Sequence, residues 1–225
     1  MDMINFFNSD PIAANICRDI LKVYTTLAHN GFITGTWGNI GVRYENYYIL
    51  TPSRVSLDEM TEYDMVVLDS DGSVVHGHRV PTSEREIHRL IMNGRVDINA
   101  TIHTHSPYAI AASATGLCIP PLFEEMTQLL GGKIPCTSRY VPAGSHMELA
   151  ETTTDALGEY NAVLLRNHGA FCCGRDINEA MVTCQVVEKA AQVYLTLEGK
   201  TDFNEIPSDY AVSERNRFLT RYGKE

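Results

Sequence analysis

Three histidines are the side chains in this sequence whose type and spacing point most directly to chemistry. His103 and His105 stand two residues apart in the segment IHTHS, and His168 follows the apolar strand-like segment LLRN and precedes a glycine. Neutral imidazole is the most common protein ligand for borderline cations such as Zn²⁺. A catalytic zinc site uses three protein ligands and keeps one position open for substrate. The three histidines therefore predict such a site, although a surface pair that binds nothing is an alternative interpretation of His103 and His105.

An acid and two hydroxyls stand together in the segment PTSE, residues 81–84. Thr82, Ser83 and the backbone N–H groups of a helix start form a corner that can bind an anion. Glu84 supplies an acid or base of the kind that a catalytic metal needs nearby. The alternative interpretation is structural, because Ser83 is also a typical helix cap and Glu84 is a favourable acid at a helix N-terminus.

Two more segments have the composition of anion-binding turns. Residues 34–40, TGTWGNI, place two glycines, hydroxyls and Asn39 before a predicted strand, which allows a ligand to approach the backbone closely. Ser53 and Arg54, in the segment TPSR, offer a hydroxyl and a guanidinium for a phosphate. Neither segment has the spacing of a dinucleotide or P-loop motif, so nucleotide binding is not indicated. A simple tight turn is the alternative for both.

The elements that must position these residues follow from hydrophobic periodicity and turn signals. Helices are predicted at 10–29, 84–94, 106–114, 122–130, 145–157, 177–194 and 208–222, with capping-box patterns at Ser83 and Ser145. Strands are predicted at 41–44, 47–51, 65–69, 73–76, 98–103, 133–136, 162–166 and 170–173. Several strands form hairpins, so the pattern indicates a mixed or antiparallel sheet with helices packed on it.

Length and composition limit the number of domains and the classes of partner and location that are expected. The 225 residues, 44% of them hydrophobic and without a linker-like stretch, predict one domain over 1–225. The formal charge of -10 argues against nucleic acid as a partner. The sequence shows neither a signal peptide nor an apolar run long enough to span a membrane, so a cytoplasmic protein is expected. The six cysteines form no C-x-x-C pair, which favours reduced thiols.

Taken in order, these segments resemble the class II aldolase/adducin family, and its L-fuculose-1-phosphate aldolase members in particular. The resemblance runs through GTWGNI, LTPSRV, PTSEREIH, HTHSPYA, GGKIPC, LLRNHGAF and a C-terminal RYG. It implies a three-layer α/β/α fold whose central sheet is mainly antiparallel. It also implies a homotetramer whose active sites lie at subunit interfaces.

The same resemblance implies roles for individual residues. The three histidines match the family's zinc ligands, and Glu84 matches the acid that ligates zinc in the resting enzyme and serves as the base. Tyr222 matches a C-terminal tyrosine that reaches a neighbouring active site, where it could handle a proton of the substrate. Positions of the family's phosphate cradle are occupied here by Asn39, Ser53, Thr82 and Ser83.

Two positions depart from the family pattern. Arg54 stands where the family usually has glycine; its guanidinium could contact the phosphate or face solvent. Glu124 stands where fuculose-type aldolases have a catalytic tyrosine. A sufficiently desolvated Glu124 could donate the proton itself, and the alternative is a surface acid at the start of a helix.

The resemblance implies a zinc-dependent aldolase that reversibly cleaves a ketose 1-phosphate to dihydroxyacetone phosphate and an aldehyde. L-Fuculose 1-phosphate and a 5-deoxypentulose or methylthioribulose 1-phosphate are the candidate substrates. A metal-dependent decarboxylase of a phosphorylated 3-oxo sugar acid and a sugar-phosphate 4-epimerase are the alternatives. The family's epimerases carry Asp where Glu84 stands, which favours an aldolase over an epimerase. Its adducin-like members lack the full histidine set that this sequence has, which favours an enzyme over a non-catalytic interaction protein.

Overall fold

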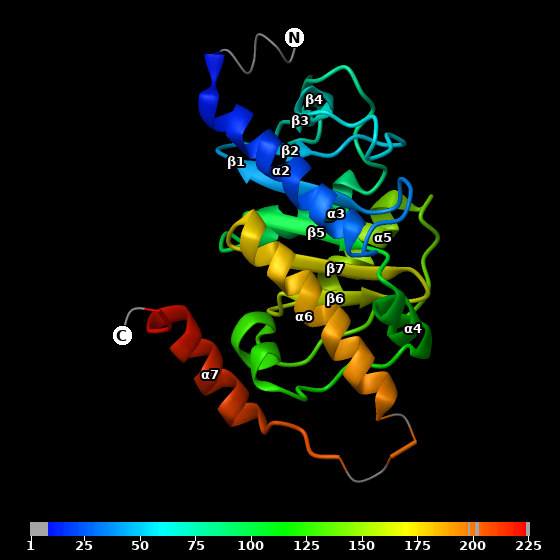
Figure 1. Cartoon of the computed structure of the whole chain (residues 1–225), viewed down its shortest axis with the longest axis vertical. Helices are drawn as coiled ribbons and strands as arrows, with labels where there is room; N and C mark the ends of the chain where they lie inside the picture. Colours follow the sequence, from blue (N-terminus) through cyan, green and yellow to red (C-terminus); the bar gives the residue numbers. More distant parts are fainter. Residues whose placement is uncertain (1–8, 198, 201–202, 224–225) are drawn as a thin grey trace.

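A seven-stranded antiparallel sheet forms the centre of the protein (Figure 1), whose computed structural model describes residues 9–197, 199–200 and 203–223. The strands follow one another in space in the order β4-β3-β2-β1-β5-β7-β6. Their bounds are β1 Asn39–Tyr44, β2 Tyr47–Leu50, β3 Val66–Leu68, β4 Val74–His76, β5 Ala100–Thr104, β6 Ala162–Leu165 and β7 Gly169–Gly174. The three predicted hairpins β1–β2, β3–β4 and β6–β7 are all present.

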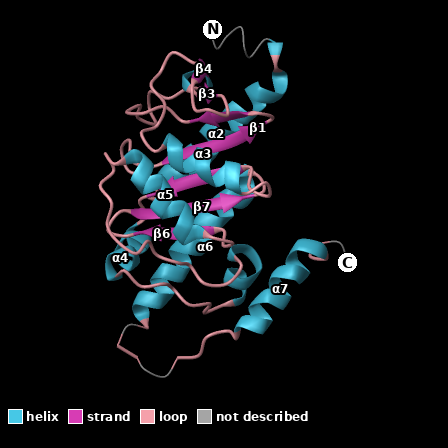
Figure 2. Ribbon diagram, turned by 180° about the vertical axis from the view of Figure 1, so that it is seen from behind, coloured by secondary structure: helices cyan, strands magenta, loops and turns pink. Residues whose placement is uncertain are grey.

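Helices cover both faces of the sheet, as the opposite views in Figures 1 and 2 show. One hydrophobic core packs α2 (Pro11–His29), α4 (Pro107–Thr115) and α6 (Ile177–Thr196) against one face. A second core packs α3 (Arg85–Gly94) and α5 (His146–Leu157) against the other face. Neighbouring residues of β7 serve both cores, because Cys172 points to the first and Cys173 to the second. The expected three-layer α/β/α architecture is confirmed.

The C-terminal helix α7 (Ser208–Thr220) is held more loosely than the others. Ala211 is its buried residue, and the helix packs against the short helix η2 (Met126–Leu130). A further short helix, η1, spans Glu62–Asp64. Within the described residues, no helix has both the length and the apolar character needed to cross a membrane.

Two predicted elements differ in the structure. Residues 133–136 form no strand: Ile134 and Cys136 make isolated bridges to Ile119 and Leu164. Pro135 has no N–H to donate, which limits the segment to these single contacts. The helix predicted at 122–130 begins only at Glu124 and continues as the single wide turn of η2.

The two predicted capping boxes do not form. Helix α3 begins at Arg85 with Glu84 at the N-cap position, so Ser83 lies one residue too early and makes no cap bond. Glu86, the expected partner of Ser83, instead accepts from Arg89 Nε at 2.8 Å. Ser145 does stand at the N-cap of α5, but its side chain makes no cap hydrogen bond there.

Candidate active site

The three histidines converge at one end of the sheet, on the face covered by α3. His103 lies in β5, His105 follows that strand, and His168 lies in the turn between β6 and β7. The turn is possible because the preceding Asn167 adopts the left-handed conformation with φ 57°. The Nε2 atoms of His103 and His105 are 2.9 Å apart. One ligand atom from each of the three imidazoles lies within 4.8 Å of the others.

Contacts behind the histidines aim their ring nitrogens at this common point. The backbone carbonyl of Ala170 lies 3.0 Å from His103 Nδ1 and accepts a hydrogen bond from it, which leaves the Nε2 lone pair facing the cluster. Phe171 stacks on the His103 ring with centroids 5.3 Å apart. Burial lowers the pKa of both His103 and His105 to about 3, so both rings are neutral at physiological pH.

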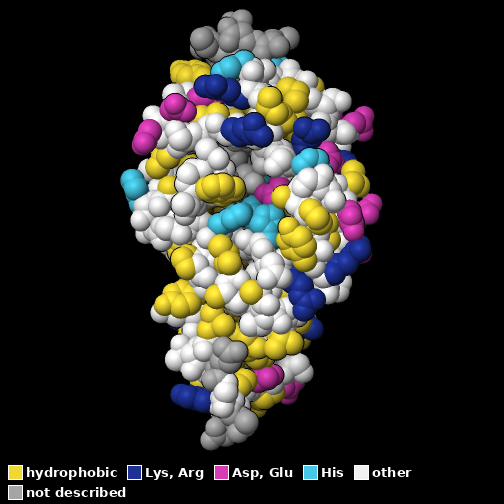
Figure 3. All heavy atoms as spheres, turned by 90° about the vertical axis from the view of Figure 1, so that its right-hand side faces the viewer, with side chains coloured by type: hydrophobic (Ala, Val, Ile, Leu, Met, Phe, Trp, Pro, Cys, Tyr) yellow, Lys and Arg dark blue, Asp and Glu magenta, His cyan; other side chains and the backbone are white. Residues whose placement is uncertain are grey.

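Glu84 completes the cluster from the start of α3. Its side chain is 6% exposed, with Oε1 3.3 Å from His168 Nε2 and Oε2 3.5 Å from His103 Nε2. Three imidazoles and a carboxylate are a ligand set that suits Zn²⁺. The described residues therefore fit a divalent cation. Figure 3, which views the end of the sheet that carries the site, shows histidine and acidic side chains together in a recess.

Asn39 connects Glu84 to a fourth histidine, which the sequence did not single out. Strand register pairs Asn39 with His103, so both side chains lie on the α3 face. Asn39 Nδ2 donates to Glu84 Oε2 at 2.7 Å, and Asn39 Oδ1 lies 2.7 Å from Nε2 of His88. His88 is fully buried, and burial lowers its pKa to about 3. A histidine four residues after Glu84 on the same helix was the signal that could have revealed it.

The residues predicted to bind phosphate gather beside Glu84. A bridge between Pro52 and Pro81 brings the two segments together, and Ser53 and Ser83 line one pocket of about 210 Å³. Thr82 is buried between them, and its Oγ1 accepts from the backbone N–H of Glu84 at 3.3 Å. Asn39 lies on the Glu84 side of this group.

Two further polar side chains at the same pocket, a guanidinium and an imidazole, were missed by the sequence analysis. Arg85 and His146 line it together with Ser53 and Ser83. Arg85 directly follows Glu84, whereas His146 comes from the start of α5 and is brought near only by the fold. Arg54 is exposed at a left-handed φ of 58°, a conformation that glycine adopts most easily.

The two predicted proton donors lie elsewhere in the chain. The Glu124 side chain is 64% exposed, and its Oε1 contacts Gln128 at 2.8 Å and Arg217 at 3.6 Å. Tyr222 is 60% exposed and contacts the ring of Phe218. In Figure 1, α7 lies beyond the end of the strands opposite the β6–β7 turn. The structure thus does not bring these two residues to the histidine cluster of their own chain. The Glu124 carboxylate is exposed within its own chain and lacks the desolvation that a proton donor was expected to need.

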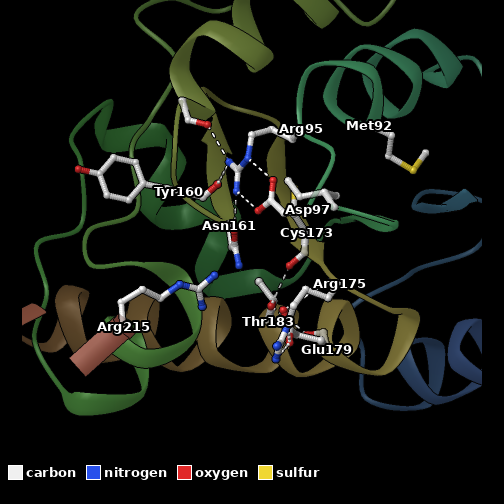
Figure 4. A network of polar contacts seen from close by, with 12 residues as sticks. Met92, Arg95, Asp97, Tyr160, Asn161, Cys173, Arg175, Glu179, Thr183 and Arg215 are labelled. Carbon is white, nitrogen blue, oxygen red and sulfur yellow. Dashed lines mark hydrogen bonds and ion pairs between the residues drawn. The ribbon is translucent and has the colours of Figure 1, made fainter. Parts of the chain in front are cut away.

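A polar network around Arg95 joins the segment after α3 to the segment before β6 (Figure 4). Arg95, just after α3, donates to both carboxylate oxygens of Asp97 at 2.8 and 2.7 Å. It also donates to the carbonyls of Gly158 and Tyr160 at 2.9 and 3.2 Å. From α7, Arg215 donates to two carbonyls of η2 at 2.6 and 2.8 Å, which ties the C-terminal helix to the body of the protein.

Comparison with known proteins places this arrangement in a family. Residues 18–195 match the family described as "Class II Aldolase and Adducin N-terminal domain". L-fuculose phosphate aldolase of Escherichia coli K12 is 31% identical over 208 residues, which cover 92% of this chain and 95% of the relative. The 5-deoxy-D-ribulose 1-phosphate aldolase of Bacillus thuringiensis serovar kurstaki is 30% identical over 210 residues, covering 92% of this chain and 97% of the relative.

The structural comparison points to the same family as the sequence comparisons. A solved structure of an L-fuculose 1-phosphate aldolase superposes with a TM-score of 0.86 at 27% identity, covering 91% of this chain and 96% of the other. These similarities extend over nearly the full length of the aldolases compared and make this protein an enzyme of the aldolase type, a lyase. The chain belongs to the class II aldolase and adducin family.

Proposed function

We propose that the protein is a zinc-dependent aldolase that reversibly cleaves a ketose 1-phosphate to dihydroxyacetone phosphate and an aldehyde. One observation carries this proposal. The ligand atoms of His103, His105 and His168 converge within 4.8 Å, beside the buried carboxylate of Glu84 and the hydroxyl-lined pocket of Ser53 and Ser83. A cation site next to an anion pocket is what a phosphorylated ketose needs.

The three histidines would hold the cation, and Glu84 would join them in the resting enzyme. A bound Zn²⁺ supplies a Lewis acid that stabilises the negative charge that develops when the C3–C4 bond of the sugar breaks. His103 and His105 are suited to this because burial holds them in their neutral form. His103 is also oriented by its bond to the Ala170 carbonyl.

Glu84 is the proposed base. In the condensation direction it removes a proton from dihydroxyacetone phosphate, and in the cleavage direction it returns that proton. Its position is fixed, because Asn39 donates to Oε2 at 2.7 Å and the side chain is 6% exposed. Its other oxygen, Oε1, lies on the His168 side of the cluster, at 3.3 Å from that Nε2.

The phosphate would bind beside this base. Ser53 and Ser83 offer hydroxyl donors, and Thr82 and Asn39 border the same region. Arg85 adds a guanidinium to the pocket wall. These groups place one end of the substrate, so that its reacting carbons lie near Glu84.

The proton at the C4 oxygen would be handled by Tyr222 or Glu124, supplied by a neighbouring subunit. Within their own chain, Glu124 contacts Arg217 and Tyr222 contacts Phe218, both residues of α7. We propose a cytoplasmic homotetramer in which one subunit presents these residues to the site of the next. Exposed apolar residues on α7, Tyr210 at 64% and Val212 at 60%, favour a surface that is covered in the assembly.

The aldehyde distinguishes the candidate substrates. Removing dihydroxyacetone phosphate leaves lactaldehyde from L-fuculose 1-phosphate, acetaldehyde from a 5-deoxypentulose 1-phosphate, and a methylthio-substituted aldehyde from methylthioribulose 1-phosphate. Glu124 in place of the expected tyrosine changes the residue that would face this end of the substrate. A panel of these three sugars, assayed by coupled detection of dihydroxyacetone phosphate, identifies the substrate.

The same assay separates the alternatives. A decarboxylase of a phosphorylated 3-oxo sugar acid would release carbon dioxide and no dihydroxyacetone phosphate. A 4-epimerase would interconvert two pentulose phosphates without cleavage. Release of dihydroxyacetone phosphate from at least one sugar of the panel supports the proposal, and no release from any of them, with turnover in either other assay, refutes it.

A further inference from the structure

We infer that His88 is a positioning residue: its ring fixes the orientation of the Asn39 amide, and this amide in turn holds the Glu84 carboxylate where it exchanges protons with substrate. The inference rests on the proposed role of Glu84 as the base. His88 lies one helical turn beyond Glu84 in α3 and contacts neither substrate pocket nor cation ligands in the hydrogen bonds described.

The relay consists of three short hydrogen bonds in series. Thr101 Oγ1 lies 2.6 Å from His88 Nδ1, His88 Nε2 lies 2.7 Å from Asn39 Oδ1, and Asn39 Nδ2 lies 2.7 Å from Glu84 Oε2. Thr101, Asn39 and Glu84 are 0%, 6% and 6% exposed. A chain of buried bonds of this kind fixes the positions of all its members, because water cannot replace any of them.

The direction of each bond follows from the ends of the relay. Glu84 as a carboxylate only accepts, so Asn39 must present its NH₂ group to Oε2 and its carbonyl oxygen to His88. That oxygen also only accepts, so His88 Nε2 must carry the hydrogen. The neutral ring has one N–H, which leaves Nδ1 to accept from the Thr101 hydroxyl. A weaker alternative acceptor for that hydroxyl, the Gly41 carbonyl, is 3.5 Å away.

The absence of a side chain at Gly41 of β1 leaves space for the His88 ring against the sheet. A Cβ atom added at Gly41 would lie 2.7 Å from His88 Nδ1 and 2.9 Å from Cγ, so a side chain at this position of β1 would exclude the ring. Strand register places Gly41 opposite Thr101, directly beneath the ring. Phe171 meets the ring edge-on, with centroids 4.9 Å apart. An apolar side chain could fill this space without the desolvation cost of a histidine, so a function in hydrogen bonding explains the histidine better than packing does.

Without His88 the carbonyl oxygen of the Asn39 amide would lose its partner, and the amide would be held at its NH₂ end alone, by the bond to Glu84. The amide and the Glu84 carboxylate could then shift together, so Glu84 would lose its fixed position. Misplacing a reacting group by about 1 Å can lower a rate by about 100-fold.

The test compares His88→Gln with His88→Met in the zinc-loaded protein. The Gln amide nitrogen can replace Nε2 as a donor to Asn39, whereas Met fills a similar volume without a donor. Thr101→Val serves as a matched control, because it removes a hydroxyl from the relay and keeps the Nε2 side of the ring. Two rates are measured for each variant: cleavage of the sugar phosphate, and exchange of hydrogen between dihydroxyacetone phosphate and deuterated water without any aldehyde.

We expect His88→Met to lower both kcat and the exchange rate at least about tenfold, with KM within about twofold and an unchanged zinc content. His88→Gln should recover most of the loss, and Thr101→Val should lie between wild type and Met. Equal losses in the Gln and Met variants, or full activity in the Met variant, would overturn the inference.

A second measurement does not depend on activity or on a folded variant. Nitrogen-15 NMR of wild-type protein labelled in histidine distinguishes the two neutral forms of the ring. We expect His88 to carry its hydrogen on Nε2; a hydrogen on Nδ1 would contradict the relay. If wild-type protein neither cleaves any ketose phosphate nor exchanges the dihydroxyacetone phosphate hydrogen, the proposed function fails, and the NMR result still decides whether the relay exists.

Discussion

Acidification should destabilise the metal-free protein through its buried histidines. His88 and His103 are both 0% exposed, and burial lowers the pKa of each to about 3. In the unfolded chain each titrates near the ordinary value of about 6.5. Below about pH 6.5 these two histidines bind protons in the unfolded state, whereas in the folded state they stay neutral until the pH approaches 3. The stability that these groups contribute is therefore complete above pH 6.5 and is lost progressively as the pH falls toward 3.

The size of the effect follows from these values. Between pH 7.5 and pH 5.0, each such histidine should lower the free energy of unfolding by about 2 kcal/mol, so His88 and His103 together by about 4 kcal/mol. This is a large share of the roughly 5–15 kcal/mol that stabilises an ordinary domain. In His88→Met the same change of pH should lower the free energy of unfolding by about 2 kcal/mol less, because only His103 of this pair remains.

Urea unfolding measures the effect directly. The curves are recorded in chelator at pH 7.5, 6.5, 5.5 and 5.0, at one protein concentration so that subunit association is constant. His29→Met, at the exposed end of α2, is the control for replacing a histidine outside the core. If wild type and His88→Met show the same pH dependence, the buried neutral state assigned to His88 is wrong.

Three further outcomes follow from individual contacts. His105→Ala should lower zinc affinity at least about 100-fold, more than loss of an outer-shell partner does, and zinc content after gel filtration measures this; unchanged content would exclude His105 as a ligand. Ser83→Ala should raise KM about tenfold or more with little change in kcat, because a hydrogen bond to a charged group contributes about 1.5–3 kcal/mol; an unchanged KM would remove Ser83 from the phosphate pocket. Arg95→Met should lower the free energy of unfolding by about 1–2 kcal/mol while zinc binding stays intact, since it removes the bonds to the exposed Asp97 and to the carbonyls of Gly158 and Tyr160; a neutral result would show that the network of Figure 4 contributes little to stability.

Local signals in the sequence were sufficient for most of the architecture. The hairpin turn at Gly72 has the left-handed backbone that glycine favours, and the turn at Glu45 adopts the same conformation with a residue that favours it less. Asp176 caps α6, accepting from the N–H of Glu179 at 2.9 Å. These features depend on neighbours within four residues, which is the range over which sequence patterns are informative.

Elements that depend on distant partners were harder to predict. Residues 133–136 have a strand-like composition, but their contacts come from Ile119 and Leu164, and Pro135 interrupts the ladder. The capping box at Ser83 does not form because of the position and direction of Glu84. Glu84 occupies the N-cap position, and its side chain turns toward the histidines instead of bonding to the helix start.

The residues of the candidate site also differ in whether local sequence signals or distant contacts reveal them. Its cluster of histidines could be proposed from spacing, because two of them share one strand end and the third lies in a tight turn. His88 could not, since a histidine on the buried face of a helix is usually explained by packing. Its importance appears only when strand register places Thr101 and Asn39 at its two nitrogens and Gly41 beneath its ring. The roles of Glu124 and Tyr222 stay predictions, because the proposal for them needs a neighbouring subunit.

The most direct test of the central claim is the release of dihydroxyacetone phosphate by purified protein, measured with and without chelator and in Glu84→Gln. We predict that zinc-loaded wild type cleaves one of the ketose 1-phosphates, that chelator abolishes cleavage and zinc restores it, and that Glu84→Gln retains zinc but cleaves at least about 100-fold more slowly. Full cleavage by metal-free protein, or normal turnover by the Gln variant, would contradict the account.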